Sequence, residues 1–220
     1  MHDCLQRLAS VKNKINEIML EKQLKTNPEI IVVTKTFSLN NIIPLVKSDH
    51  PHFGENKIQE AEDKWTEIKK TNNNIKLHMI GRLQSNKAKK AVKLFDYIHS
   101  LDSTKLATKI SQYEKELNKK VKLFVQVNLA EETQKSGIFL KDLDNFLQYC
   151  TINLSLNIIG LMCIPPIESN PDKYFKLLKA SAEKRNLKEL SMGMSSDFES
   201  AIKNGSTYLR LGTAILGKKN

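Results

Sequence analysis

Apolar side chains in the first part of the chain recur every three to four positions. This spacing runs through residues 3–25 and predicts an amphipathic helix whose apolar face carries Leu5, Leu8, Ile15, Ile18 and Met19. The segment Thr26-Asn27-Pro28 predicts the end of that helix, because proline cannot continue the helical hydrogen bonds. We therefore expect residues 1–26 to form an N-terminal helix that packs on the structure that follows.

After residue 28, short apolar segments typical of buried strands alternate with segments of helical spacing. The eight predicted strands cover residues 30–35, 51–54, 75–80, 96–100, 121–128, 157–162, 188–192 and 207–211. Residues 55–70 and 172–185 repeat apolar side chains at helical spacing and predict two of the helices between the strands. Eight strands alternating with helices in 220 residues predict an α/β fold with one domain over residues 1–220: a single (β/α)8 TIM barrel with an extra N-terminal helix. A doubly wound open sheet is the alternative, because the second strand is short.

Polar side chains and glycines concentrate at the carboxyl ends of the predicted strands. In a (β/α)8 barrel the functional groups lie at those ends and in the loops that follow them. The first strand ends at Lys35, and the other strand ends carry Glu55, Asn56, His78, Asn128, Met162, Ser195, Arg210, Gly212 and Thr213. We therefore expect the functional site among these residues.

The segment after the seventh strand, GMSSDFESAIKNG, combines a glycine-containing loop with the start of a helix. Ser196 and Glu199 have the S-x-x-E spacing of a capping box, which predicts that the helix begins there. Unpaired amides and the helix dipole make such a start a binding site for anions, and the amides of Gly212 and Thr213 would complete it. A capped helix that binds no ligand is the alternative.

Lys35 and Arg210 are cations that the strand pattern directs toward the mouth of the barrel. By alternation, Lys35 shares a face with Ile31 and Val33, which are expected to fill the interior. An amine that is desolvated at such a mouth becomes a nucleophile toward an aldehyde, whereas an amine paired with an acid such as Glu55 does not. A guanidinium in the same place needs an acceptor, which is either a carboxylate or a ligand atom.

A lysine, an anion site and an arginine at one barrel mouth match the three groups that pyridoxal 5′-phosphate (PLP) requires. The lysine amine forms a Schiff base with the aldehyde of PLP, the anion site binds the phosphate, and a polar group faces the ring nitrogen. The three features together favour a PLP site more strongly than any one of them does alone.

Composition and charge limit the other functions. The net charge of +11 would attract nucleic acid, but the lysines are spread along the whole chain without a zinc-finger spacing or an aromatic RNA-binding motif. Three cysteines far apart in the chain are typical of a reducing compartment, and no apolar run approaches a membrane span. We therefore expect a cytoplasmic protein without nucleic-acid or membrane partners.

His50 and His52 lack the partner spacing of a metal site, so we expect no metal and place both at the surface or at a cap.

Six segments of the chain resemble the YggS/PROSC family of PLP homeostasis proteins. They occur in the family's order from about residue 30 to the end: VVTKT, HFGENKIQEAEDKW, HMIGRLQSNKAK, VQVNLAEETQKSGI, GLMCIPP and SMGMSSDFESAIKNGSTYLRLGTAILG. The resemblance implies a single barrel related to the N-terminal domain of alanine racemase. It also implies that PLP is the cofactor and that it is bound to the lysine of the first strand.

The resemblance further implies roles for individual residues. Lys35 resembles the lysine that forms the Schiff base, and Arg210 resembles the residue that faces the pyridine nitrogen, where an arginine weakens the ring as an electron sink. The residues that resemble the phosphate site are Ser195, Ser196, Gly212 and Thr213. Pocket-lining roles are implied for Asn56, His78 and Met162. Lys135 resembles a second lysine near the mouth that takes part in PLP transfer.

Two functions are compatible with this resemblance. One is a monomeric carrier or regulator that turns over no substrate, holds PLP as a Schiff base and supplies it to apo-enzymes, its expected partners. The other is a PLP-dependent enzyme similar to an amino-acid racemase. Racemases of this barrel type take a second acid/base group, a tyrosine, from a further β domain, and this sequence ends at Asn220 shortly after the eighth strand. We therefore expect the carrier and no enzyme.

Overall fold

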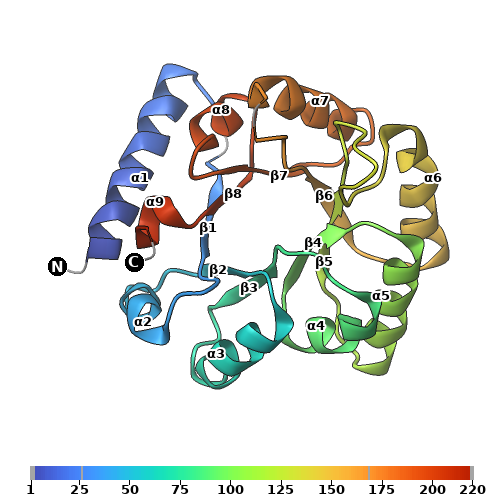
Figure 1. The fold of residues 1–220 in the computed structure, drawn as a ribbon, viewed down its shortest axis with the longest axis horizontal. Helices are drawn as coiled ribbons and strands as arrows, with labels where there is room; N and C mark the ends of the chain where they lie inside the picture. The colour runs from blue at the N-terminus through green and yellow to red at the C-terminus, as the bar shows by residue number, and fades with distance from the viewer. Residues whose placement is uncertain (1–2, 26, 168, 219–220) are drawn as a thin grey trace.

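Eight parallel strands form a closed barrel at the centre of the molecule, with helices around it (Figure 1). The computed structural model describes residues 3–25, 27–167 and 169–218. The strands are β1 (Glu29–Val33), β2 (His52–Glu55), β3 (Lys76–Met79), β4 (Tyr97–Leu101), β5 (Lys122–Gln126), β6 (Ile158–Met162), β7 (Glu189–Met194) and β8 (Tyr208–Leu211). Each lies within two residues of its predicted range. Because β1 pairs with both β2 and β8, the predicted (β/α)8 barrel is confirmed and the open sheet is wrong.

Helices follow the strands along the chain and cover the outside of the barrel. They are α1 (Asp3–Glu21), α2 (Leu39–Lys47), α3 (Ile58–Thr71), α4 (Ala88–Leu94), α5 (Thr104–Glu116), α6 (Leu143–Gln148), α7 (Pro171–Glu183), α8 (Phe198–Lys203) and α9 (Thr213–Leu216). Their apolar faces and the outer faces of the strands form one large core that includes Trp65, Phe95 and Phe175, all 0% exposed. Each such side chain contributes roughly 2 kcal/mol through burial. In the part of the chain that the structure describes, no helix has the length and apolar character needed to cross a membrane.

The predicted N-terminal helix is present as α1, beside α9 and α8 at the junction of β8 and β1 (Figure 1). The helix that follows β8 has only four residues, and α1 therefore covers the place where a longer eighth helix would lie. α1 ends at Glu21, before the predicted end, because Gln23 adopts a φ of 51° and the amide of Leu24 closes back on the carbonyl oxygen of Met19. Residues 1–2 and 26 of the predicted helix lie outside the described residues. The interpretation of residues 1–220 as one domain stays a prediction.

The inside of the barrel contains a second apolar cluster and a set of buried polar side chains. The apolar cluster consists of Ile31, Tyr97, Phe124, Met162 and Tyr208. Between these side chains lie four buried polar residues, His78, His99, Ser191 and Arg210. Buried polar groups are costly unless they are hydrogen-bonded, so the interior of this barrel requires a hydrogen-bond network of its own.

Candidate cofactor site

A cavity of about 730 Å³ opens at the carboxyl ends of β1, β2, β7 and β8. Seven of the nine residues predicted to bind the cofactor line it: Lys35, Asn56, Ser195, Ser196, Arg210, Gly212 and Thr213. Much of the remaining wall is apolar or small: Val33, Phe37, Ile80, Gly81, Ile164 and Met194. The volume is in the range of cofactor sites, and barrels place their sites at this end.

Lys35 lies in a turn beyond β1 and not on the strand itself. β1 ends at Val33, and Thr36 has a φ of 66°, a left-handed conformation that redirects the chain toward α2. Lys35 is exposed at the mouth of the cavity, so the desolvation expected for its amine is not found here. The alternative of an ion pair with Glu55 is also wrong, because among the described residues Glu55 pairs with Lys64.

A network around Lys64, on α3, holds the segment that leads to Lys35. The Lys64 ammonium group donates to the carbonyl oxygen of Thr34 at 2.7 Å. It also lies 3.1 Å from Glu55 Oε1 and 2.6 Å from Glu60 Oε1. The Glu55 carboxylate is 0% exposed and accepts a further hydrogen bond from the hydroxyl of Thr34 at 2.7 Å. The backbone immediately before Lys35 is thereby fixed to β1, β2 and α3.

Glu60 fixes the turn from the other side. Its carboxylate accepts a hydrogen bond from the backbone amide of Thr36, the residue after Lys35. Burial alone would raise the pKa of Glu60, but hydrogen bonds from Lys64 and from that amide outweigh it and lower the pKa. Sequence reasoning did not identify Glu60 and Lys64 as parts of the site. Their only signal is the i,i+4 spacing of an acid and a base on a predicted helix.

The ends of β7 and β8 meet at the hydroxyl group of Ser195. Its Oγ accepts the amide hydrogens of Gly212 at 3.3 Å and of Ala214 at 3.1 Å. Ser196 and Thr213 also line the cavity, and their amides have no acceptor within the described residues. A hydroxyl group with several amides beside it is the donor set that binds phosphate groups in many proteins.

The capping box predicted at Ser196 and Glu199 is not formed. α8 begins one residue after Asp197, and no side chain caps its amides. Asp197 closes a tight turn instead: its Oδ1 accepts the amide hydrogen of Met194 at 2.6 Å, and its own amide donates to the Met194 carbonyl oxygen at 3.1 Å. This turn keeps Ser195 and Ser196 outside the helix, where both line the cavity.

Arg210 reaches the cavity from inside the barrel and is only 4% exposed. Its guanidinium donates to Ser191 Oγ at 2.7 Å and to the carbonyl oxygen of Cys163 at 2.9 Å. Neither partner is the carboxylate that the sequence offered as one alternative. Burial lowers the pKa of Arg210, but a guanidinium stays protonated in proteins. The cavity therefore has a buried positive charge at its floor.

His78 and Met162, to which the resemblance gave pocket-lining roles, do not line this cavity. Both are 0% exposed and lie deeper in the barrel. Met162 belongs to the interior apolar cluster, and the ring of His78 stacks on that of Tyr97 with centroids 4.2 Å apart. Strand alternation directs these side chains inward, and the closed barrel then covers them.

Lys135 lies beside a different and smaller cavity, of about 240 Å³, which also contacts Asn128 and Tyr174. It forms an ion pair with Glu132 at 2.9 Å on the loop after β5. Ile164 lines both cavities, so this loop is a neighbour of the candidate site without being part of its wall.

His50 and His52 are buried and not at the surface as expected, with only 7% and 9% of their area exposed. His50 Nε2 lies 3.0 Å from the carbonyl oxygens of both Ile30 and His52, which accounts for its burial. His52 contacts His78 within the barrel. No cluster of three or more metal-ligating side chains is found among residues 3–25, 27–167 and 169–218.

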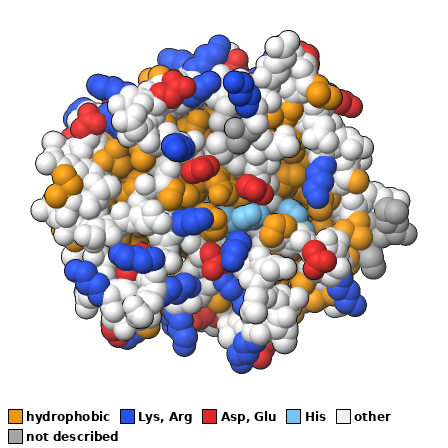
Figure 2. Space-filling view, turned by 180° about the vertical axis from the view of Figure 1, so that it is seen from behind, with side chains coloured by type: hydrophobic (Ala, Val, Ile, Leu, Met, Phe, Trp, Pro, Cys, Tyr) orange, Lys and Arg blue, Asp and Glu red, His pale blue; other side chains and the backbone are white. Residues whose placement is uncertain are grey.

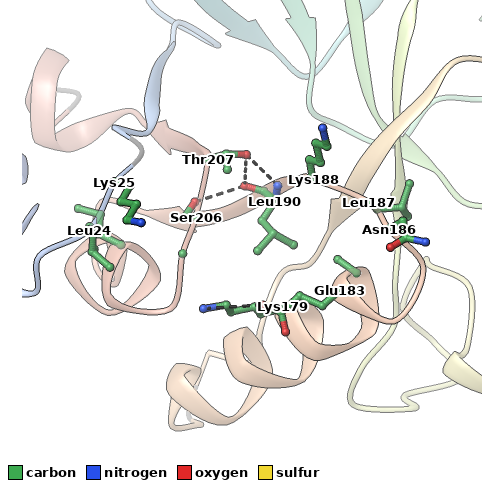
Figure 3. Close-up of a pocket in the computed structure, with 13 residues that line it drawn as sticks. Leu24, Lys25, Lys179, Glu183, Asn186, Leu187, Lys188, Leu190, Ser206 and Thr207 are labelled. Carbon is green, nitrogen blue, oxygen red and sulfur yellow. Dashed lines mark hydrogen bonds and ion pairs between the residues drawn. The ribbon is translucent and has the colours of Figure 1, made fainter.

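A further cavity, of about 510 Å³, lies at the opposite end of the barrel (Figure 3). Its lining residues Leu190 and Thr207 are at the amino-terminal ends of β7 and β8, and their polar groups bond to each other. Lys179 lies beside Glu183 at 3.9 Å on α7. Barrels place their functional groups at the other end, so this cavity is not the candidate site.

The chain is similar over nearly its whole length to proteins of known family. The family described as "Alanine racemase, N-terminal domain" matches residues 7–220. The pyridoxal phosphate homeostasis protein of Escherichia coli K12 is 32% identical, covering 100% of this chain and 98% of the relative. The protein of the same name from Synechocystis is 38% identical, covering 89% of this chain and 94% of the relative. PipY of Synechococcus elongatus, in a structure with PLP bound, is 34% identical with a TM-score of 0.84, covering 97% of this chain and 100% of PipY.

The fold and the strand-end cavity thus define a barrel of the alanine racemase N-terminal class. Within that class, the two relatives that are more than 30% identical, one over 100% and one over 89% of this chain, identify the narrower family. The chain belongs to the family of pyridoxal phosphate homeostasis proteins, as the resemblance of its motifs predicted.

Proposed function

We propose that this protein binds PLP in the cavity at the carboxyl ends of β1, β2, β7 and β8, and holds it as a Schiff base on Lys35 for supply to apo-enzymes. One observation carries the proposal: Lys35, Arg210 and the Ser195 donor group line a single cavity. The PLP-bound structure of PipY and the names of the relatives support the same cofactor.

The residues present fit the three reactive parts of PLP. The Lys35 amine would add to the aldehyde carbon, and loss of one water molecule would leave the C=N bond of the Schiff base. The phosphate would accept hydrogen bonds from the Ser195 hydroxyl and from the amides of Ser196 and Thr213. Arg210 would face the ring nitrogen as a donor, which keeps that nitrogen unprotonated.

The wall of the cavity favours holding the cofactor over catalysis with it. Among the described residues that line it, Lys35 and Arg210 are the only ionisable ones. A racemase needs a second acid/base group on the opposite face of the ring, and an unprotonated ring is a weak electron sink. The exposure of Lys35 supports exchange, because water and an acceptor amine can reach the bond that must be cleaved for release.

A spectroscopic experiment tests this proposal. Purified protein loaded with PLP should be yellow, borohydride should fix the cofactor, and peptide mass spectrometry should find it on Lys35. Hydroxylamine should remove the colour from unreduced protein, and Lys35→Ala should not acquire it. Cofactor fixed to another lysine, or no colour at all, would contradict the site. Steady racemisation of an amino acid by the loaded protein would instead establish an enzyme.

We further propose that the chain acts as a cytoplasmic monomer with one PLP-binding domain over residues 1–220. The compact pairing of α1 with α8 and α9 supports a single unit. Light scattering coupled to size exclusion, with and without PLP, should give the mass of one chain, 25.1 kDa. Stimulation of an apo-enzyme by loaded protein, but not by loaded and borohydride-reduced protein, would support delivery of the cofactor.

A further inference from the structure

A chain of hydrogen bonds crosses the inside of the barrel and ends on Arg210. His52 Nδ1 lies 2.8 Å from His78 Nε2, and His78 Nδ1 lies 2.9 Å from His99 Nε2. His99 Nδ1 lies 2.7 Å from Ser191 Oγ, to which Arg210 also donates at 2.7 Å. The five residues belong to β2, β3, β4, β7 and β8, so only closure of the barrel brings them together.

The outer end of this hydrogen-bond chain is His52, at the amino-terminal end of β2. Figure 2 shows histidine side chains near the centre of one face, among acidic and basic side chains. Of the three histidines in these hydrogen bonds, His78 and His99 are 0% exposed and His52 is 9% exposed. His52 Nε2 lies 3.5 Å from a carboxylate oxygen of Glu29. The chain therefore links a surface carboxylate to the floor of the cofactor cavity.

The three histidines of the chain lie against aromatic rings, and their burial favours the neutral form of each imidazole. His78 stacks on Tyr97, and His99 stacks on Phe124 with ring centroids 4.3 Å apart. Burial lowers the pKa of His52 and holds the pKa values of His78 and His99 well below their usual range; the charge of Arg210 adds to this at His99. A neutral imidazole donates from one nitrogen and accepts at the other, so each ring continues the chain in one direction.

The arginine sets that direction. A guanidinium only donates, so Ser191 accepts from Arg210 and has its own proton available for His99 Nδ1. His99 then carries its hydrogen on Nε2 and donates to His78, and His78 in turn donates to His52. His52 then carries its hydrogen on Nε2, which lies 3.5 Å from the Glu29 carboxylate. A cation at one end and an anion at the other thus favour the same tautomer, with the hydrogen on Nε2, at all three rings.

We propose that Ser191, His99, His78 and His52 are positioning residues that hold Arg210 in one orientation beneath the cofactor cavity. Among the described residues Arg210 has no carboxylate partner, so these hydrogen bonds and that to the Cys163 carbonyl oxygen determine where its guanidinium points. Loss of a link leaves a buried donor or acceptor unpaired, and the interior relaxes to pair it again. The effect on the cofactor rests on the proposed function; the ordering of the chain does not.

The first test needs no cofactor. Nitrogen-15 NMR of histidine-labelled protein near neutral pH separates the two neutral tautomers and the charged form. His52, His78 and His99 should each show the neutral form with the hydrogen on Nε2. The opposite tautomer or a charged ring at any of the three would overturn the proposal, whether or not PLP binds.

The second test uses the PLP-loaded protein and a matched pair of positions. His52→Phe keeps an aromatic ring but leaves the Nε2 hydrogen of His78 without an acceptor, so release of PLP should accelerate about fivefold. His52→Gln restores an acceptor and should return the rate to near that of the unsubstituted protein. His50→Gln is the control, because His50 is buried at the same face but bonds only to backbone oxygens.

The outcomes distinguish a positioning role of these hydrogen bonds from an effect of side-chain packing alone. Faster release in His52→Phe, rescued in His52→Gln and absent in His50→Gln, supports a positioning role. Equal rates in all variants, or equal acceleration in both glutamine variants, overturn it. If PLP does not bind at all, the proposed function fails. The tautomers measured by NMR still decide whether Arg210 orders the hydrogen bonds of the three histidines.

Discussion

Ser195 Oγ accepts the amide hydrogen of Gly212 at 3.3 Å, and this bond joins the loop after β7 to the end of β8 at the cavity. The hydroxyl group thus already sits among the amides that we propose to bind phosphate. Its own hydrogen points to no acceptor within the described residues, so it is available to a ligand. The donor set is therefore built by two strands that are neighbours only in the closed barrel.

Replacing Ser195 by alanine removes that donor, and with it the acceptor of the Gly212 and Ala214 amides. A hydrogen bond to a charged group contributes about 1.5–3 kcal/mol, so affinity for PLP should fall about 10- to 100-fold. Pyridoxal, which has no phosphate, should bind Ser195→Ala as well as it binds the unsubstituted protein. Titration of both compounds by absorbance would check this. An equal loss for pyridoxal would mean that Ser195 does not contact the phosphate.

Removing the charge of Lys64 should destabilise the fold. Lys64→Met leaves the fully buried Glu55 carboxylate without its cation, which costs about 3–5 kcal/mol in comparable buried pairs. Lys70→Met, on the same helix, is the control, because its pair with Glu67 is exposed and should change stability by less than about 0.5 kcal/mol. Urea unfolding measures both. Similar values for the two variants would show that the Glu55 network does not stabilise the turn before Lys35.

Stability should decrease in mild acid because His50 is buried in its neutral form. Burial lowers its pKa to about 4, while in the unfolded chain its pKa is near 6.5. The unfolded state therefore binds a proton that the folded state rejects, and stability present above pH 6.5 is lost as the pH falls toward about 4. A shift of this size corresponds to about 3 kcal/mol for this one group.

His50→Gln provides the measurement of that effect. The free energy of unfolding, determined in urea at about pH 7 and about pH 5, should fall less in His50→Gln than in the unsubstituted protein. His52, His78 and His99 have lowered pKa values as well, so part of the acid sensitivity should remain. An unchanged pH dependence would show that His50 does not titrate as its burial requires.

Gly193, on β7 just before the turn at Ser195, should not tolerate a side chain. Its φ is +93°, and a Cβ atom would lie 2.6 Å from the Cβ of Ala201 on α8. Gly193→Ala should destabilise the protein by about 3 kcal/mol or more, combining backbone strain with overpacking. Gly205→Ala is matched in φ, at +84°, but its Cβ would meet only the flexible side chain of Lys179. It should cost about 1 kcal/mol; equal losses in thermal unfolding would show that the clash is relieved.

Sequence reasoning brought most of the predicted site residues to one end of the barrel but did not give the hydrogen-bond partners of each residue there. Lys35, Ser195, Arg210 and Gly212 were found because strand ends can be read from the chain and the barrel places them together. The resemblance assigned His78 to the pocket wall, yet its ring turns into the barrel and bonds to His52 and His99. Which of two neighbouring positions faces the cavity depends on the tilt and register of the strands, which periodicity does not reveal.

The same limit explains the helix start after β7. Ser196 and Glu199 have a valid capping spacing, but Asp197 competes for the loop by bonding Met194, and the helix begins later. Glu60 and Lys64 had no separate signal beyond their spacing, because the groups they bind come from β1 and β2. Local sequence patterns show which contacts are possible, and residues far apart in the chain decide which of them form.

The sequence by itself determined the order of strands and helices and the residues at the strand ends, since periodicity and alternation are properties of each segment. Only the tertiary structure decided that Glu55 pairs with Lys64 and leaves Lys35 exposed, and that three histidines join Ser191 beneath Arg210. Those contacts join residues far apart in the chain. Their geometry is set when the barrel closes and buried polar groups must find partners inside it.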